Sequence, residues 1–582
     1  MTDQQHRARP QRRRPDLAPT TRRPTPVSGP LGHAIEVGRT RLLITGAVLT
    51  MAFATIAARM VDVAVVHSDA VLANGDSGHT EQATSARADI LDRNGVIVAT
   101  SLRTASLYAD PIMVLDPQDA AYRLATVLPS LDPAQTAERL SGKGRFVWLK
   151  RNLTPRQQLA VNRLGIPGLD FREEETRVYP HGPLLSHIVG FVDIDNRGIS
   201  GIEKTFEERL HLEDAPVTLS VDIRVQHILR DELSKAMERF RAVGAAGTIL
   251  DVRTGEIVAM VSLPDFDPNH PGAAADDERF NRNSLGQYEM GSVFKVFTTA
   301  MALDSGVVRV DGGYDASQPI HVSRFTIRDY HAKNRWLSVP EIFMYSSNIG
   351  SAKMALDVGG PAQRAFLQRL GMLDPVAVEL PEVGAPMVPA QWRPINTMTI
   401  AFGHGIAVSP LHTVSGVAAM VGDGIVRRPT LMKHNPSDEI AGRRVISEAT
   451  VRQMRKLMRL VVEQGTAKAA AAPGYVVGGK TGTAEKQSSG GYDRDALISS
   501  FVGAFPMQDP RYVVFALLDE PKGDKGTHGY ATGGWVAAPV IKDVVERAAP
   551  LLGVQPTDET APDLRKYLAI DLGAEEKRLA AY

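Results

Sequence analysis

Residues 289–301 have the sequence Glu-Met-Gly-Ser-Val-Phe-Lys-Val-Phe-Thr-Thr-Ala-Met, and the fold and function of the chain depend on this stretch. Ser292 and Lys295 are three positions apart at the start of an apolar run, and residues at i and i+3 share one face of a helix. The Lys295 amine can therefore reach the Ser292 hydroxyl. Apolar surroundings lower the pKa of a lysine, and a neutral amine can take the proton of a serine. The pattern favours a nucleophilic serine, although S-x-x-K alone also fits a lysine that only extends to water.

The composition excludes several classes of function. The chain has 582 residues, which is enough for about three to four domains. Its 66 basic and 66 acidic side chains cancel, which argues against nucleic acid as the main partner. Without cysteine the chain forms no disulfide, no thiolate zinc site and no cysteine nucleophile. The 15 histidines lack H-E-x-x-H or comparable spacing, so we expect no zinc site.

The first 66 residues have the pattern of a basic tail followed by a membrane anchor. Residues 1–41 carry nine arginines and few large apolar side chains, so this segment is expected to be disordered. Leu42 to Ala58 contains no charge, and extension to Val66 gives a candidate transmembrane helix over 42–66. By the positive-inside rule, the tail is cytoplasmic and the bulk of the chain lies outside the membrane. A cleaved signal peptide is disfavoured because the basic and apolar segments are long and no A-x-A site follows.

Residues 67–215 are expected to form a turn-rich, mixed α/β pedestal domain. The segment 87–99 contains a strand, an Asn-Gly turn and a second strand, which predicts a hairpin. The segment 110–166 is predicted to be mostly helical, with helices beginning at Pro133 and Pro155. No catalytic set of residues occurs in this region, so we expect a structural or docking role.

Residues 216–552 have the pattern of an α/β (α+β) fold with one central antiparallel sheet flanked by helices. Strand patterns occur at both ends of a mainly helical region, 290–465, so the strands are expected to join in a single sheet. The predicted strands are 217–221, 246–251, 257–262, 475–485, 498–505 and 512–519, and the predicted flanking helices are 223–240 and 536–548. Residues 553–582 are expected to be a C-terminal tail.

Two further motifs follow the serine and the lysine. Ser346-Ser347-Asn348 begins 54 residues after Ser292, and Lys480-Thr481-Gly482-Thr483 begins 134 residues after Ser346. Taken alone, the first motif suits a helix cap or a turn, and the second suits a bulged strand. All three motifs in this order, within the predicted framework of strands and helices, indicate one composite site.

This order of motifs resembles the penicilloyl-serine transferases, which comprise penicillin-binding proteins and serine β-lactamases. Segments outside the site resemble the class B penicillin-binding proteins: 87–99, 177–190, 198–203, 402–411, 519–521 and 533–539. Together with the site motifs, the resemblance covers roughly residues 40–550. Ala88 and Met290 depart from the family pattern, which usually has glycine and proline there. Neither position carries a reacting group.

Within class B, two features favour the division-specific (FtsI) type. The elongation type often has aspartate where this chain has Asn348. The segments Asp519-Glu520-Pro521 and 533–539 also match the division type more closely.

The resemblance implies a peptidoglycan D,D-transpeptidase that acts through a serine acyl-enzyme during septal cell-wall synthesis and is a target of β-lactams. Ser292 would attack the carbonyl between the two terminal D-alanines of a stem peptide, and D-alanine would leave. Lys295 would accept the serine proton, while Ser346 and Lys480 would relay a proton to the leaving amine. An amine of a neighbouring stem peptide would then take the acyl group, without a metal or a cofactor.

The same resemblance assigns the residues that bind the substrate. Asn348 would hold the substrate amide and help to orient the lysine, and the hydroxyls of Thr481 and Thr483 would bind the substrate carboxylate. The backbone N–H groups of Ser292 and Thr483 would form the oxyanion hole. Gly482 would let the substrate backbone lie close along the strand edge.

Other proteins carry the same three motifs. A serine β-lactamase is normally smaller and soluble, and a bifunctional class A protein needs a glycosyltransferase domain, whose motifs residues 67–215 lack. An elongation-type class B transpeptidase and a non-synthetic β-lactam sensor on the same fold remain alternatives. His404, in a glycine-rich turn, either lines the cleft or is structural.

The implied partners are peptidoglycan stem peptides, β-lactams, the membrane, a SEDS glycosyltransferase (FtsW type) and other divisome proteins, but no nucleic acid. Arg59 and Asp62 lie near one membrane face, where they either contact that glycosyltransferase or extend to the interface. The implied location is the inner (plasma) membrane, with one span, a cytoplasmic N-terminus and a periplasmic catalytic domain.

Overall fold

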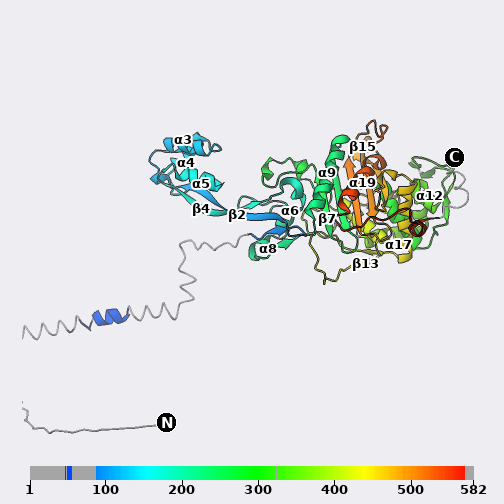
Figure 1. Cartoon of the computed structure of the whole chain (residues 1–582), viewed down its shortest axis with the longest axis horizontal. Coiled ribbons are helices and arrows are strands. Elements are labelled where there is room, and N and C mark those ends of the chain that lie inside the picture. Colours follow the sequence, from blue (N-terminus) through cyan, green and yellow to red (C-terminus); the bar gives the residue numbers. More distant parts are fainter. Residues whose placement is uncertain are drawn as a thin grey trace, which may run out of the picture. The chain divides into compact units, whose positions relative to one another are not determined.

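The computed structural model describes residues 43, 46–47, 49–55, 87–322, 325–488 and 491–570 (Figure 1). The chain divides into two compact units, residues 1–83 and 84–582. The described residues of the first unit are helical and exposed. Within the described ranges, no helix has both the length and the apolar character that a membrane span requires. The basic tail 1–41 and most of the predicted span 42–66 lie outside the described residues.

The pedestal region is built on a sheet of five strands in the order β3-β2-β1-β5, with β4 paired to β2. The predicted hairpin of β1 and β2 is present, and its turn uses Gly95 at a φ of 84°, where glycine is favoured. The strands are β1 (Ile90–Leu91), β2 (Ile97–Ala109), β3 (Val147–Leu153), β4 (Leu169–Val178) and β5 (Val217–Thr218).

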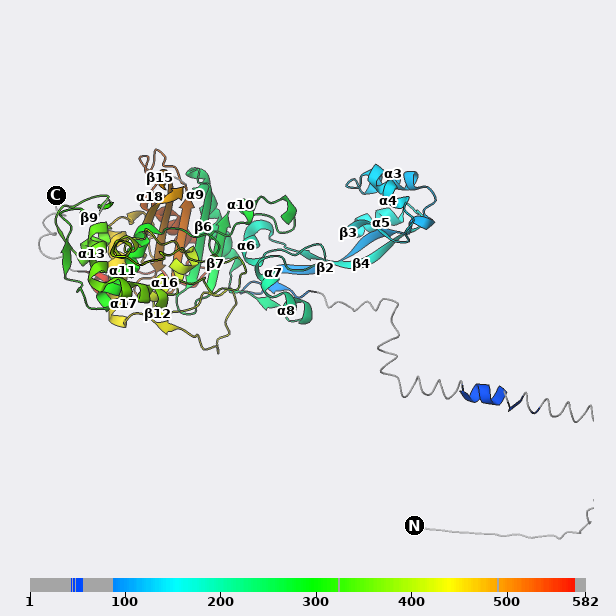
Figure 2. The same ribbon diagram turned by 180° about the vertical axis from the view of Figure 1, so that it is seen from behind.

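A small helical lobe lies at the far ends of β2 and β4 (Figure 2). Its helices α3 (Pro117–Val127), α4 (Pro133–Leu140) and α5 (Pro155–Asn162) each begin with proline behind an Asp or Thr cap. The predicted helix starts at Pro133 and Pro155 are therefore confirmed. The prediction that 110–166 is mostly helical is wrong for β3. This strand is held by its pairing with β2, a partner that no local pattern reveals.

The pedestal segments that resemble class B proteins meet in a buried ion cluster. The Glu203 carboxylate accepts hydrogen bonds from Arg87 Nε and from Arg177 Nε, both at 2.7 Å. The three side chains are 0–1% exposed. One carboxylate therefore holds two arginines that lie far apart in the sequence, and this contact fixes the base of the pedestal.

Replacing Glu203 with glutamine is expected to destabilise the protein by about 3–5 kcal/mol, because buried Arg177 loses its counter-charge and buried Arg87 keeps only the partly exposed Glu207. The matched control is Glu207→Gln. The Glu207 carboxylate also pairs with Arg87, at 2.8 Å, but its side chain is 33% exposed, so water can replace it. Thermal unfolding of the full chain measures both variants. Equal losses would contradict the central role of Glu203.

The C-terminal domain contains a five-stranded sheet in the order β14-β15-β16-β6-β7, in which all neighbours are antiparallel. The strands are β6 (Gly244–Asp251), β7 (Ile257–Leu263), β14 (Gly478–Ser488), β15 (Gly491–Phe505) and β16 (Tyr512–Asp519). The predicted single antiparallel sheet is confirmed for the other predicted strands, and β16 matches its predicted range, but the prediction is wrong for 217–221. That segment forms β5, which pairs in parallel with β1 in the pedestal sheet. Every residue of β16 is buried, so both faces of the sheet are covered.

Helices cover the two faces. The helices α9 (Ile223–Arg239) and α19 (Ala538–Ala548) pack against each other and against one face (Figures 1 and 2). On the other face lies α16 (Pro410–Val421), next to α11 (Lys295–Asp304) and α17 (Glu448–Glu463). The helical region between β7 and β14 contains three short strand pairs that were not predicted: β8 (Gly313–Asp315) with β11 (Trp336–Ser338), β9 (Ile320–Val322) with β10 (Phe325–Ile327), and β12 (Ile425–Val426) with β13 (Arg443–Arg444).

The remaining helices are short or lie within the helical region. They are α6 (Ser186–Val189), α7 (Gly201–Thr205), α8 (Glu207–Leu212), α10 (Asp276–Arg279), α11 (Lys295–Asp304), α12 (Val339–Met344), α13 (Asn348–Val358), α14 (Gly360–Arg369), α15 (Pro394–Ile400), α17 (Glu448–Glu463), α18 (Gly533–Val536) and α20 (Pro562–Leu568).

Residues 553–570, the described part of the predicted C-terminal tail, pack on this domain. Glu559 forms an ion pair with buried Arg459 at 2.7 Å and accepts a hydrogen bond from Gly474 N at 3.0 Å. Leu568 in α20 is buried. This part of the predicted tail therefore belongs to the folded domain, because it is fixed by an ion pair and by apolar burial.

Candidate active site

Ser292 lies in a 3₁₀ turn, Gly291–Phe294, that leads directly into α11. The sequence analysis places both motif residues on a helix, whereas only Lys295 belongs to α11. Residues i and i+3 of a 3₁₀ turn eclipse each other, and Lys295 Nζ lies 2.9 Å from Ser292 Oγ. Gly291 has a φ of 53°, and a Cβ there would lie 2.4 Å from Thr483 O. Glycine therefore allows the serine turn to lie directly against β14.

The second motif forms the turn between α12 and α13. Ser346 has a φ of 61°, a left-handed conformation that is uncommon outside glycine. Ser347 caps α13 and donates a hydrogen bond from Oγ to Asp329 Oδ2 at 2.7 Å. This cap fixes a turn in which the Ser346 hydroxyl and the Asn348 side chain face Lys295.

The amine of Lys295 is the centre of the site. Its Nζ lies 2.6 Å from Ser346 O, 2.8 Å from Asn348 Oδ1 and 3.0 Å from Ser346 Oγ, in addition to its contact with Ser292. The two carbonyl oxygens can only accept, so they take two N–H hydrogens. A neutral amine has two hydrogens and one lone pair, and the lone pair is then left for a hydroxyl.

Both lysines of the site are buried, which changes their protonation. Burial, and then the positive charge of Lys480, hold the pKa of Lys295 well below its ordinary value. Burial lowers the pKa of Lys480 to about 7. Lys480 Nζ lies 3.0 Å from Ser346 Oγ, so this hydroxyl lies between two amines. A continuous chain of groups that can exchange protons thus runs from Ser292 through Lys295 and Ser346 to Lys480.

Stability should depend on pH through Lys480. Above a folded-state pKa of about 7 the folded chain loses this proton, whereas an unfolded lysine keeps it up to about pH 10.4. The unfolded state then binds more protons, so the contribution to stability rises with pH between these values. We expect the thermal midpoint of the wild type, relative to Lys480→Met, to increase from pH 6 to pH 9. A difference that stays constant would mean that Lys480 remains charged.

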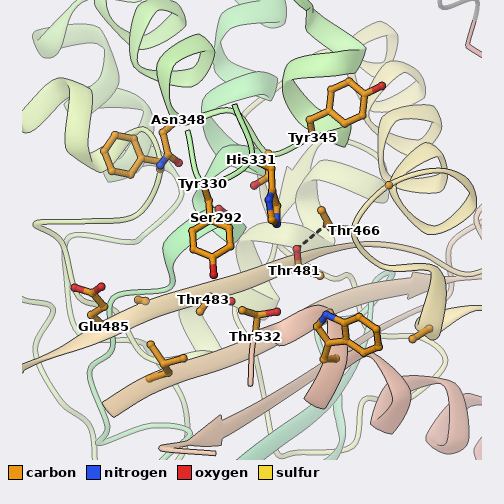
Figure 3. Close-up of a pocket in the computed structure, with 18 of the residues that line it drawn as sticks. Ser292, Tyr330, His331, Tyr345, Asn348, Thr466, Thr481, Thr483, Glu485 and Thr532 are labelled. Atoms are coloured by element: carbon orange, nitrogen blue, oxygen red, sulfur yellow. Dashed lines mark hydrogen bonds between the residues drawn. The ribbon is translucent and has the colours of Figure 1, made fainter. Parts of the chain in front are cut away.

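The reacting groups open into a cavity of about 890 Å³, one wall of which is β14 (Figure 3). Because β14 is the edge strand of its sheet, its backbone can pair with an extended peptide. Thr481 and Thr483 line the cavity. The Thr481 hydroxyl lies 2.9 Å from that of Thr466, and Thr483 Oγ1 accepts a hydrogen bond from Gly533 N at 3.1 Å.

Gly482 differs from its neighbours on β14. A Cβ at this position would lie 2.4 Å from Ser500 Oγ and 2.6 Å from Met290 O, inside the protein. Side chains alternate between the faces of a strand, so among residues 481–483 it is Thr481 and Thr483 that point toward the cavity. The absence of a side chain at Gly482 makes room for the serine turn.

Several residues of the site have no signal in the sequence. Asp329 orients the cap of α13, and the other residues line the cavity from loops or strand ends: Tyr330, His331, Tyr345, Thr466, Glu485, Thr532 and Trp535. They reach the site only through tertiary packing.

His404 lines the cavity, and its buried Nδ1 has no hydrogen-bond partner among the described residues. Among the described residues, no group of three or more His, Asp or Glu side chains could hold a metal ion.

Comparison with known proteins identifies the family. Residues 245–546 match the penicillin binding protein transpeptidase domain, and residues 82–235 match the penicillin-binding protein dimerisation domain. The "Probable peptidoglycan D,D-transpeptidase FtsI" of Caulobacter vibrioides is 41% identical over 491 residues, which are 82% of this chain and 83% of the relative. The chain belongs to the class B penicillin-binding proteins. The resemblance found in the sequence is thereby confirmed.

Two more relatives extend this comparison. The "Peptidoglycan D,D-transpeptidase FtsI" of Escherichia coli K12 is 28% identical over 92% of this class B penicillin-binding protein and 96% of its own length. The solved apo transpeptidase domain of Burkholderia pseudomallei penicillin-binding protein 3 has a TM-score of 0.53 and 32% identity, covering 58% of this chain and 98% of that one. Ser292, Lys295, Ser346 and Lys480 all lie inside the matched transpeptidase domain.

Proposed function

We propose that this class B penicillin-binding protein is a D,D-transpeptidase that cross-links peptidoglycan stem peptides during septal cell-wall synthesis. The observation that carries the proposal is the position of Lys295 Nζ, which lies within 3.0 Å of the Ser292 hydroxyl, the Ser346 hydroxyl and the Asn348 amide oxygen. A serine beside a buried amine with a lowered pKa is suited to acyl transfer. The FtsI names of the relatives and Asn348 support the septal role.

The first half of the reaction forms an acyl-enzyme. Ser292 Oγ attacks the carbonyl carbon between the terminal D-alanines, and Lys295 Nζ takes its proton. When the C–N bond breaks, the leaving D-alanine amine gains a proton from the Ser346 hydroxyl. Ser346 then regains a proton from Lys295 or Lys480, the two amines beside it. β-Lactams react with the same serine and leave it acylated.

The substrate lies along β14 in this proposal. The backbone N–H groups of Ser292 and Thr483 stabilise the oxyanion. Because Thr483 Oγ1 already accepts a hydrogen bond from Gly533, its own hydrogen is available for the substrate carboxylate, which Thr481 also binds. The Asn348 Nδ2 group donates to Arg328 O at 2.9 Å, so the proposed contact with the substrate amide needs a second hydrogen of this group.

The domain organisation is proposed from the sequence. Residues 1–41 form a basic cytoplasmic tail, 42–66 a single membrane span, 67–215 the pedestal, 216–552 the transpeptidase domain, and 553–582 a terminal segment that begins on that domain. The protein is then held in the inner membrane with its catalytic domain in the periplasm. Membrane association that survives deletion of residues 42–66 would contradict the anchor.

The proposed membrane partner is a SEDS glycosyltransferase of the FtsW type, together with other divisome proteins. The support for a contact is the pair Arg59 and Asp62, two charges beside an apolar segment. Unchanged co-purification after charge reversal at both positions would count against it.

The experiment that tests the proposed function uses the full-length chain and a synthetic stem pentapeptide that ends in D-Ala-D-Ala. Release of D-alanine and formation of a cross-linked dimer are expected. A variant with Ser292→Ala should fail to support septation in cells depleted of the wild type. Normal septation with that variant would favour a sensor over a synthetic enzyme.

A further inference from the structure

A second cavity, of about 510 Å³, lies next to the first one. The two cavities share Glu485, which lines both. Along β14, Thr483 and Ala484 line the first cavity and Lys486 lines the second. The labelled side chains of Thr483 and Glu485 follow one another along this strand, away from Thr481 (Figure 3). One continuous strand therefore leads from the nucleophile into a separate space.

The strand changes its pairing at the boundary. Glu485 lies opposite Leu497 of β15, whereas Lys486 lies opposite Asp493, so the register shifts between these two residues of β14. Just beyond the shift, Lys486 Nζ reaches Asp519 Oδ1 at 2.9 Å and Glu520 Oε1 at 2.8 Å. Lys486 and Asp519 both line the second cavity, so this part of its wall is charged.

Glu289 also lines the second cavity. Its carboxylate accepts hydrogen bonds from Gly405 N at 2.9 Å and from the Tyr492 hydroxyl at 3.1 Å. Glu289 is three residues before Ser292, so the second cavity is lined by the segment that leads into the serine turn. Because Glu485 lines both cavities, a group bound beside it in the second cavity also faces the first one.

The charges of the second cavity favour a cationic group. Among the described residues, four carboxylates line it against two cations: Asp277, Glu289, Glu485 and Asp519, against Arg282 and Lys486. Arg282 pairs with Asp277 at 2.7 Å and Lys486 pairs with Asp519, so both cations are neutralised. Within the described ranges, the half-buried Glu485 carboxylate has no hydrogen-bond or ion-pair partner. A partly buried carboxylate without a counter-charge is a binding site for an ammonium group.

We propose that the second cavity binds the acceptor stem peptide and that Glu485 binds its side-chain ammonium group at the junction of the two cavities. This inference rests on the proposed function of the first site. After acylation, the ammonium gives one proton to water, and the neutral amine nitrogen attacks the acyl carbon. The bond between that carbon and Ser292 Oγ breaks, and the second amine proton returns to Oγ through Lys295 Nζ. An amide cross-link and a free serine result.

The test measures how the acyl-enzyme divides between aminolysis and hydrolysis. The full-length protein receives the D-Ala-D-Ala pentapeptide as donor and a tripeptide with a free side-chain amine at its third residue as acceptor. In Glu485→Gln, the acceptor concentration that gives half-maximal aminolysis should rise about five- to tenfold, the loss expected for one charge-assisted contact. Glu485→Lys should raise it further, and Glu485→Asp, which keeps the charge, should recover part of the loss.

The matched control is Glu448→Gln, which removes a carboxylate with a 70% exposed side chain on α17 of the same domain. It should leave the division between aminolysis and hydrolysis as in the wild type. An unchanged division in both Glu485→Gln and Glu485→Lys would overturn the proposal. Failure of the wild type to release D-alanine from the donor would instead contradict the proposed function itself.

Discussion

Replacing Ser292 with alanine is expected to reduce acylation by fluorescent penicillin, and release of D-alanine from the pentapeptide, by at least about 10⁴-fold. The hydroxyl of Ser292 is the nucleophilic oxygen at 2.9 Å from a buried amine. The neighbouring Ser346 hydroxyl is held between the amines of Lys295 and Lys480. Removing one small polar group from the edge of a cavity should leave the fold intact.

The measurement is a time course of covalent labelling in which the wild type and two variants are compared. Ser305→Ala, at the exposed end of α11, is the matched control, because its hydroxyl donates to Ala302 O and does not line the cavity. Labelling of Ser305→Ala at the wild-type rate is expected. Substantial labelling of Ser292→Ala would show that another residue is the nucleophile.

The sequence predicts the parts of this site that depend on local pattern. The spacing of Ser292 and Lys295 correctly predicts their contact, and burial among apolar neighbours correctly predicts the direction of the pKa shift of Lys295. The strand pattern of 512–519 predicts β16, because a fully buried central strand consists of an unbroken apolar run.

Features that depend on partners distant in the sequence are not predictable in this way. β3 and β4 are each held by pairing with β2, and the residues of β4 are largely charged or polar. Thr466 and Asp329 contribute to the site only because the chain returns to it from other loops. The inward direction of Gly482 follows from the phase of β14, which sequence alone does not fix.

The buried amines explain why the site needs two lysines. Lys480 is one of the groups that keep Lys295 neutral, since its positive charge adds to the effect of burial. Ser346 Oγ lies 3.0 Å from both amines, so a proton taken from the nucleophile has a short path to the leaving group. Ser346 reaches this position only with a left-handed backbone conformation, which costs conformational free energy.

Replacing Lys295 with arginine is expected to lower the rate of acylation by about 10²–10⁴-fold, the contribution typical of a general base. Arginine keeps a positive charge and can donate hydrogen bonds, but its guanidinium group is not deprotonated in proteins. Lys295→Met removes the amine and fills a similar buried volume, so it should lose as much activity and remain at least as stable as the wild type.

Comparison of these two variants separates a proton-accepting role from an electrostatic one. If Lys295 served only as a fixed positive charge near the oxyanion, Lys295→Arg would keep most of the activity and Lys295→Met would not. If it takes the proton of Ser292, both variants lose activity together. The matched control is Lys353→Met on α13, whose amine donates to Asp315 O outside the cavity. Acylation rates with penicillin and thermal midpoints of all three proteins decide between these roles, and the two short contacts of Lys295 Nζ with carbonyl oxygens favour the proton-accepting one.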